Sequence, residues 1–588
     1  AFLRFGMAVF VMVGFKNLAE QLVEGRPPPR GLAFYGQAWC LQQLVPFANH
    51  ALGIENGAVD NRLLSTSDWA IRLPLTVFAM LRPSLPLLLV GHIASLVLFV
   101  VHLPFVWDHM GWSAIMEVSF VLLLFRSCVV ADGAGTSQAV PAFLATARLQ
   151  MVLLYFSAAF WKLTTSFLDP RTSCGTLLAG ELLGYLVPAG WGVADSQSAS
   201  LLLRAAPLLT VVGEFAISVL LWLWPSAGVL LGLSFHFSIC LLPVNYAGGF
   251  SIACCTRFTV FLEEAAAAVL EGQALRRALL GATALACAVA VAAARGTIDA
   301  NFALCVWLVI AHLSALMGRA LGRPSRSGGR REEGALRACW LGPCAIVAAT
   351  LCFGLLGPIL GVQNMGALTM YGNVKHYGGT NHLMVPTGVL QERCGGSLLS
   401  GAAEGRWPCD ALGGGVVRVD GTNSSALRRL VPADASSLLP AQSQALLRAS
   451  GSSGKYFAMY YSRMTSSDFL AGLPVSPAPY AVSLFELRRL LAVARRRGES
   501  FWLRFTPLPE DLRSPGLWRT HVATEVLLDE DPRSGAARCT LVNGSSSDVC
   551  DGGVVARLGQ PPWWLSKLLL PYPIPLLEGA GDEVHCSA

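Results

Sequence analysis

Charge is scarce in this chain of 588 residues, because Asp, Glu, Lys and Arg together make up 14% of it and hydrophobic residues make up 54%. Soluble domains carry about 25% charged residues, so an ordinary soluble fold is excluded for most of the chain. The net charge is only +6, and no basic face is interleaved with aromatic residues. We therefore expect no nucleic-acid partner.

Several common catalytic motifs are also absent. The sequence has no phosphate-binding glycine-rich loop, no nucleophile elbow, and no His-x-x-x-His or Cys-x-x-Cys spacing. Those spacings bring metal ligands, phosphate-binding N–H groups or a reactive serine together. No metal is therefore expected.

Long apolar runs are what the sequence does contain, and a run of about 20 residues crosses a bilayer as a helix. We predict an all-α polytopic membrane bundle of nine or ten transmembrane helices over residues 1–360. The predicted spans are 2–18, 85–106, 112–130, 142–162, 201–224, 227–244, 250–269, 275–294, 302–317 and 341–360. The run 250–269 is the doubtful one, since Arg257, Glu263 and Glu264 interrupt it. Residues 20–80, broken by Pro and Gly, are expected to form a loop.

The orientation follows from a basic linker at residues 319–337, where six arginines lie among Gly and Ser. Short basic loops stay in the cytoplasm, so residues 361–588 are predicted to be lumenal or extracellular. Two sequons, at Asn423 and Asn543, agree with that side. So do two cysteine pairs with disulfide-compatible separations, Cys394/Cys409 and Cys539/Cys550. The expected location is the endoplasmic reticulum, another secretory-pathway membrane or the plasma membrane.

The tail, residues 361–588, has the composition of a smaller α/β domain. Runs rich in β-branched and aromatic residues predict strands, and one amphipathic pattern predicts a helix. The strands are expected near 455–461, 500–505, 521–527 and 538–542, and the helix at 484–497.

Three polar residues on the span 142–162, namely Arg148, Tyr155 and Lys162, are spaced seven apart and share one helical stripe. Together with Gln150, Phe156, Ala158 and Leu163, they resemble a segment of the vitamin K-dependent gamma-carboxylases and the wider HTTM (horizontally transferred transmembrane) family. The carboxylases continue with an acidic Asp-x-Asp-Trp type sequence, whereas this chain has Thr164 to Asp169. The chain is therefore more similar to HTTM-like members of unassigned activity.

The resemblance implies that Lys162 is the base that deprotonates vitamin K hydroquinone, with Arg148 and Tyr155 near that cofactor. It further implies that O2 converts the quinol to an epoxide, which yields a base that removes a glutamate γ-proton before CO2 adds. Because the sequence after Lys162 departs from that of the carboxylases, the alternative is an epoxidase whose reaction ends at the epoxide. A quinone and a Glu-containing protein would then be partners, besides the lipid bilayer. His236, in a Phe-His pair, resembles a carboxylase histidine and is the second catalytic candidate.

Each of these residues also has a structural interpretation. Lys162 could extend to the lipid headgroups without a catalytic role, and His236 could simply bond a neighbouring helix. Glu214 and Arg126 could form an ion pair or a proton relay across helices. If all ten predicted spans cross the membrane, Lys162 lies at the lumenal end of its helix. If the run 250–269 does not cross, Lys162 lies at the opposite, cytoplasmic end. At the level of the whole protein, the alternative to an enzyme is a non-catalytic HTTM-like transporter or scaffold.

Overall fold

The computed structural model divides the chain into two compact units, which are described separately. Unit 1 comprises the segments up to His102, from His109 to Phe156 and from Glu214 to Leu351, and unit 2 comprises 103–108, 157–213 and 352–588. The residues described are 30–51, 68–103, 106, 108–130, 133–187, 197–242, 244–262, 300–321, 341–359, 368–370, 372, 374, 382–385, 416–428, 433–434, 439–452, 454, 456–458, 480–507, 525–534, 536–543, 546–549, 558–568, 574–575 and 586–587.

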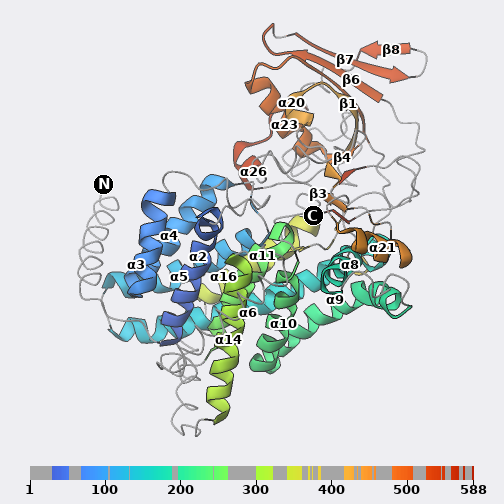
Figure 1. Cartoon of the computed structure of the whole chain (residues 1–588). Coiled ribbons are helices and arrows are strands. Elements are labelled where there is room, and N and C mark those ends of the chain that lie inside the picture. The colour runs from blue at the N-terminus through green and yellow to red at the C-terminus, as the bar shows by residue number, and fades with distance from the viewer. Residues whose placement is uncertain are drawn as a thin grey trace, which may run out of the picture. The chain divides into compact units, whose positions relative to one another are not determined.

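Unit 1 is helical (Figure 1), and several of its aromatic side chains are buried. His92 stacks between Trp39 and Phe120, with ring centroids 4.1 and 4.0 Å away. The helices that contribute to it are α2 (Arg30–Ala51), η2 (Asp68–Arg72), α3 (Leu73–Leu81), α4 (Leu85–His102), α5 (Asp108–Val130), α6 (Gly133–Trp161), α9 (Gln197–Leu223), α10 (Pro225–Cys240), α11 (Val244–Arg257), η4 (Phe258–Phe261), α14 (Ala300–Leu321) and α16 (Leu341–Ile359).

Among the described residues, three helices are long and apolar enough to cross a membrane. They cover Asp108–Phe125, Ala139–Trp161 and Gln197–Leu223. Other apolar helices, such as α4 and α10, are shorter in their apolar part. The larger number of spans stays a prediction, and the expected spans 2–18 and 275–294 lie outside the described residues.

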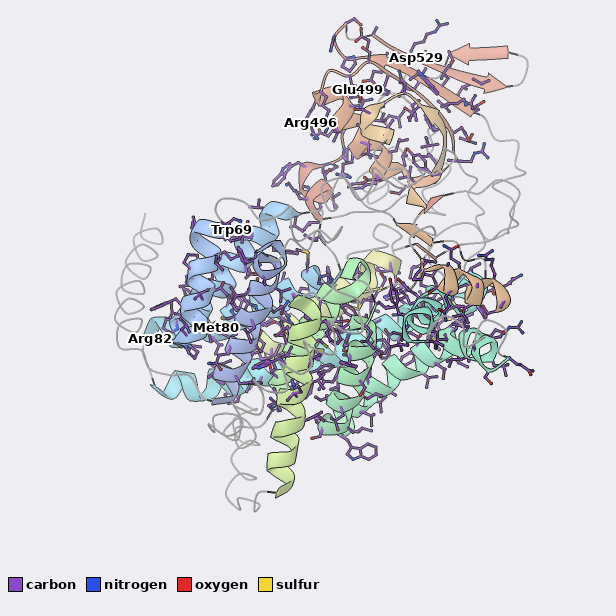
Figure 2. The ribbon with its side chains drawn as sticks, in the orientation of Figure 1. Trp69, Met80, Arg82, Arg496, Glu499 and Asp529 are labelled. Carbon is purple, nitrogen blue, oxygen red and sulfur yellow. The ribbon has the colours of Figure 1, made fainter. Side chains whose placement is uncertain are left out.

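The prediction that residues 20–80 form a loop is wrong for 30–51 and 68–81, which are helical. Tertiary contacts outweigh the polar sequence there. Tyr35 and Trp39 of α2 are buried, and Arg72 of η2 donates to Gln43 at 2.8 Å and to Asp68 at 3.3 Å. Figure 2 labels Trp69 on η2 and Met80 on α3. Paired charges allow this stretch to pack among apolar helices.

Unit 2 combines short helices with a seven-stranded antiparallel sheet in the order β8-β7-β6-β5-β1-β4-β9. A second sheet, β10-β3-β2, joins β10 to β3 in parallel. The strands are β1 (Val416–Thr422), β2 (Ala433–Asp434), β3 (Tyr456–Ala458), β4 (Tyr480–Ser483), β5 (Phe501–Pro507), β6 (Glu525–Asp531), β7 (Ala536–Asn543), β8 (Ser546–Val549), β9 (Ile574–Pro575) and β10 (Cys586–Ser587). The helices are α7 (Thr165–Leu168), α8 (Cys174–Leu186), α20 (Ser425–Arg428), α21 (Ala441–Ala449), α23 (Leu484–Arg496) and α26 (Trp563–Leu568).

The sheet and α23 confirm the predicted mixed α/β tail. Along β5, Phe501, Leu503 and Phe505 are buried while Trp502 is exposed, which is the alternation of a strand with one covered face. Ser483 is the N-cap of helix α23, because its hydroxyl accepts a hydrogen bond from the Glu486 N–H. Arg495 of α23 pairs with Glu530 of β6 at 2.5 Å and so ties the helix to the sheet.

Candidate functional site

Lys162 directly follows the last residue of α6, and its side chain is only 3% exposed. Its Nζ donates to the carbonyl of Ala158 at 3.4 Å and lies 5.8 Å from the centroid of the Phe167 ring. Beyond Lys162 the chain enters the short helix α7. The Thr164 hydroxyl caps this helix by accepting a hydrogen bond from the N–H of Phe167. The lysine is therefore buried at a helix C-terminus.

Gly372 and residues 382–383 of the tail pack against this end of α6. Trp161 donates from Nε1 to the carbonyl of Gly354 at 2.7 Å, and the Leu383 N–H donates to the carbonyl of Leu163 at 2.8 Å. A Cβ atom on Gly372 would lie 2.7 Å from the Thr369 oxygen and 3.0 Å from the Trp161 oxygen, so only glycine fits. The backbone around Lys162 is thus fixed by groups about 200 residues away in the sequence.

The side chain of His382 also contacts this end of α6, and sequence reasoning did not select it. Its Nδ1 accepts from the N–H groups of Met384 and Val385 at 3.2 and 3.1 Å. The Nε2 atom must then carry the proton, and it donates to the carbonyl of Phe160 at 2.7 Å. Burial lowers the pKa of His382, which favours this neutral form.

A second polar cluster lies inside unit 1, where the structure brings together two of the predicted site residues. Tyr155 Oη of α6 lies 2.5 Å from His236 Nε2 of α10, and His236 Nδ1 lies 3.2 Å from Ser251 Oγ of α11. The rings of Phe250 and Phe258 surround the imidazole. Three helices are therefore joined by one buried hydrogen-bonded chain.

The remaining predicted residues within 1–360 have other surroundings. Arg148 donates from Nε to the carbonyl of Val260 at 2.8 Å, and its guanidinium lies 5.9 Å from the Phe261 ring centroid. Glu214 is buried, whereas the side chain of Arg126 lies outside the described residues. Lys162 belongs to unit 2, whereas Arg148, Tyr155 and His236 belong to unit 1.

A third group of polar residues was not predicted from the sequence, because Arg257 was treated only as an interruption of the apolar run 250–269. Arg257 is fully buried and donates to Gln42 of α2 at 2.8 Å. Its guanidinium lies 3.9 Å from Glu117 of α5, which also accepts from Trp39 Nε1 at 3.1 Å. The sequence did contain a signal for this group, namely Glu117 within the apolar run 112–130. Charges inside such runs are rarely left unpaired, so Glu117 required a partner.

The predicted modification sites of the tail are only partly described. Asn423 is exposed at the end of β1, and its Oδ1 accepts from the Trp502 N–H at 2.7 Å. Cys539 is disulfide-bonded, and so is Cys174 of α8, which the sequence did not single out. Cys394, Cys409, Cys550 and the side chain of Asn543 lie outside the described residues, so their pairing and glycosylation stay predictions.

Within the part of the chain that the structure describes, no cluster of three or more His, Cys, Asp or Glu side chains could hold a metal ion. A family model described as a domain of unknown function (DUF8388) matches residues 380–567, about a third of the chain. No curated protein and no solved structure matches the chain. The match covers most of the sheet and α23, and it does not extend to Lys162, Tyr155 or His236.

Proposed function

We propose that the chain is an integral membrane enzyme of the vitamin K-dependent carboxylase type, in which Lys162 removes a proton from a quinol. The burial of Lys162 at the end of α6, with 3% of it exposed, carries the proposal. A general base must lie within reach of the proton that it removes, and an amine accepts a proton only in its neutral form. The centroid of the Phe167 ring lies 5.8 Å from Nζ and forms part of the surroundings of the amine.

The proposed reaction begins when the Lys162 amine takes a hydroxyl proton from the quinol. By the resemblance, oxygen would then give the epoxide and a strong base, the base would remove a γ-proton from a glutamate side chain on a protein substrate, and CO2 would add to the resulting carbanion. His236 as a second catalytic residue, and Arg148 and Tyr155 as quinol-binding residues, are parts of this proposal that rest on the resemblance. We place the enzyme in a secretory-pathway or plasma membrane, with its tail lumenal or extracellular.

A non-catalytic membrane protein, either a transporter or a scaffold, is the second candidate. It is favoured by the bond from Lys162 Nζ to the carbonyl of Ala158. Lysines commonly bond the last carbonyls of a helix, where the helix dipole favours a cation. In that case Lys162 would only stabilise the end of α6.

Epoxide formation from vitamin K hydroquinone distinguishes the two candidates. Membranes that contain the wild type, Lys162→Met or the control Lys567→Met are compared at matched expression, with a glutamate peptide and labelled CO2 present. Lys567 is an exposed lysine that donates to the carbonyl of Leu103 and has no proposed catalytic role. Lys567→Met therefore measures the effect of a lysine-to-methionine change outside the proposed site. If the wild type and Lys567→Met form the epoxide and Lys162→Met does not, the result supports Lys162 as the base. Labelled CO2 incorporated into the peptide extends the result to carboxylation. No product from any folded form favours the non-catalytic candidate.

A further inference from the structure

Helix α26 of unit 2 exposes three large apolar side chains. Trp563 is 73% exposed, Trp564 49% and Leu568 54%. Trp564 and Leu568 are four residues apart and so lie on one face of the helix, beside Trp563. Leu565 points the other way and is buried. Single exposed apolar residues are ordinary on a protein surface, whereas a group that includes two tryptophans indicates a surface that meets an apolar partner.

Lys567 fixes the position of α26 within unit 2. Its Nζ donates to the carbonyl of Leu103 at 3.1 Å. Leu103 directly follows α4, whose apolar part is Leu85–Val101. A few residues later, Asp108 begins α5 and one of the candidate membrane spans. Helix α26 is therefore attached to the short connection between two apolar helices.

The end of this connection lies beside the end of a second candidate span. Asp108 accepts from the Met370 N–H at 3.0 Å, and a Cβ atom on Gly372 would lie 3.0 Å from the Trp161 oxygen. Asp108 is the first residue of one candidate span, and Trp161 is the last residue of another. The ends of membrane spans lie at the bilayer surface. The part of the tail that contacts both ends therefore marks one surface, and α26 is attached on that side.

A second pair of exposed apolar residues is attached on the same side. Leu383 is 59% exposed and Met384 70%. The Leu383 N–H donates to the carbonyl of Leu163 at 2.8 Å, just beyond the end of the candidate span at Trp161. Two separate parts of the tail thus expose apolar side chains, and each part is bonded to the chain directly beyond an apolar helix. One extended partner that meets both parts, the bilayer surface, explains this shared placement better than a protein bound to one of them.

The side chains of α26 also have the chemistry of the bilayer interface. Tryptophan is enriched there, because its ring is apolar and its N–H bonds to water or headgroups. Lys567 is the one charged side chain of α26 and is already bonded, so apolar contact rather than attraction to anionic lipid holds the helix. We propose that α26 lies in the headgroup layer of the bilayer, with Trp563, Trp564 and Leu568 toward the acyl chains, and anchors the tail there. This inference rests on the membrane insertion in the proposed function and does not require Lys162.

Paramagnetic broadening of fluorine NMR resonances tests this placement in the full chain. The protein is labelled with fluorotryptophan and inserted into phosphatidylcholine nanodiscs, and Trp563→Phe and Trp564→Phe identify the two resonances by their loss. A phosphatidylcholine with a spin label at the top of an acyl chain broadens the resonances of groups within the bilayer. A gadolinium chelate in the water broadens those of groups that face solvent. Trp502 of β5, identified by Trp502→Phe, is the matched control, because it is an exposed tryptophan of the same unit.

We expect the spin-labelled lipid to broaden the resonances of Trp563 and Trp564 several-fold more than that of Trp502, and the chelate to give the reverse order. Broadening of Trp563 and Trp564 by the chelate alone would overturn the proposal, because α26 would then face water. Insensitivity of both resonances to both agents would also overturn it, since a second copy of the chain or another protein would then cover the helix.

This measurement is separate from the test of Lys162. No quinol is present, so Lys162→Met should give the same broadening as the wild type. A chain that does not co-elute with the nanodiscs would overturn both the membrane insertion in the proposed function and the placement of α26. A chain that enters the nanodiscs but leaves Trp563 and Trp564 unaffected by the spin-labelled lipid would overturn the placement of α26 alone.

Discussion

The Tyr155 hydroxyl and His236 Nε2 lie 2.5 Å apart and connect α6 to α10 inside unit 1. Both side chains are essentially shielded from water. On its other side, the imidazole contacts the Ser251 hydroxyl at 3.2 Å, so α11 joins the same chain of bonds. These contacts fix the position of His236 whether or not it takes part in catalysis.

Tyr155→Phe should destabilise the protein by about 1 to 3 kcal/mol, because it leaves a buried imidazole nitrogen without its partner. Ser251→Ala should cost less, since the bond it removes is longer. Unfolding by titration with a denaturing detergent measures both variants against the wild type. A Tyr155→Phe variant as stable as the wild type would show that the contact contributes nothing.

Glu181 of α8 predicts a dependence of stability on pH. It is fully buried, neither carboxyl oxygen has a hydrogen-bond partner among the described residues, and burial raises its pKa to about 8. The folded state then keeps a proton that the unfolded state loses near pH 4.5. Stability should fall by up to about 1.4 kcal/mol per pH unit from about pH 5 to pH 8 and then level off.

The matched variant is Glu181→Met, which keeps the size of the side chain and removes the titrating group. We expect the stability difference between Glu181→Met and the wild type to grow with pH across that window, as followed by thermal unfolding in buffers from pH 5 to pH 9. A constant difference would mean that Glu181 is ionised in the folded protein. Because α8 packs against α21 of the tail, with Gly184 beside Ser443, the loss should first appear at that contact.

We expect the dependence of stability on pH that comes from His382 to have the opposite sign. Burial lowers its pKa below the usual 6.5, so the unfolded chain binds the proton first and stability is lost as the pH falls from about 6.5 through that lower value. Protonation of Nδ1 removes the acceptor of the Met384 and Val385 amides. Hydrogen exchange of these two amides, corrected for the intrinsic rate, should speed up at low pH. The Gly372 amide, which donates to a backbone carbonyl, is the internal reference and should not change.

The sequence predicted those elements whose pattern is local. The 3.6-residue period of α23 and the alternation along β5 depend on neighbouring residues, so both were found within a few positions. Helix α2 was missed because its burial depends on partners in other helices, such as the bond from Trp39 to Glu117. His382 was missed for a similar reason, since its partner Phe160 is 222 residues away. No local pattern records such a pairing.

The side of the membrane on which the tail lies can be tested at Asn423. Ser425→Ala abolishes this sequon but keeps the Asn423 side chain bonded to Trp502 and the residue-425 N–H that donates to Glu499 at 2.7 Å. We expect the wild type, expressed in cells that glycosylate, to lose mass on treatment with a glycosidase and Ser425→Ala to lose one glycan fewer. Equal masses before and after treatment for both proteins would contradict a lumenal tail.

The most direct test of the proposed function is the rate of epoxide formation by Lys162→Ala, measured with and without added ethylamine. A positioned base contributes about a hundred-fold to ten-thousand-fold to a rate, so the variant should lose at least about 99% of the wild-type activity while it remains folded. An external amine that enters the vacated space should restore part of the rate in proportion to its concentration. Epoxide formation by Lys162→Ala at the wild-type rate would contradict the assignment of Lys162 as the base.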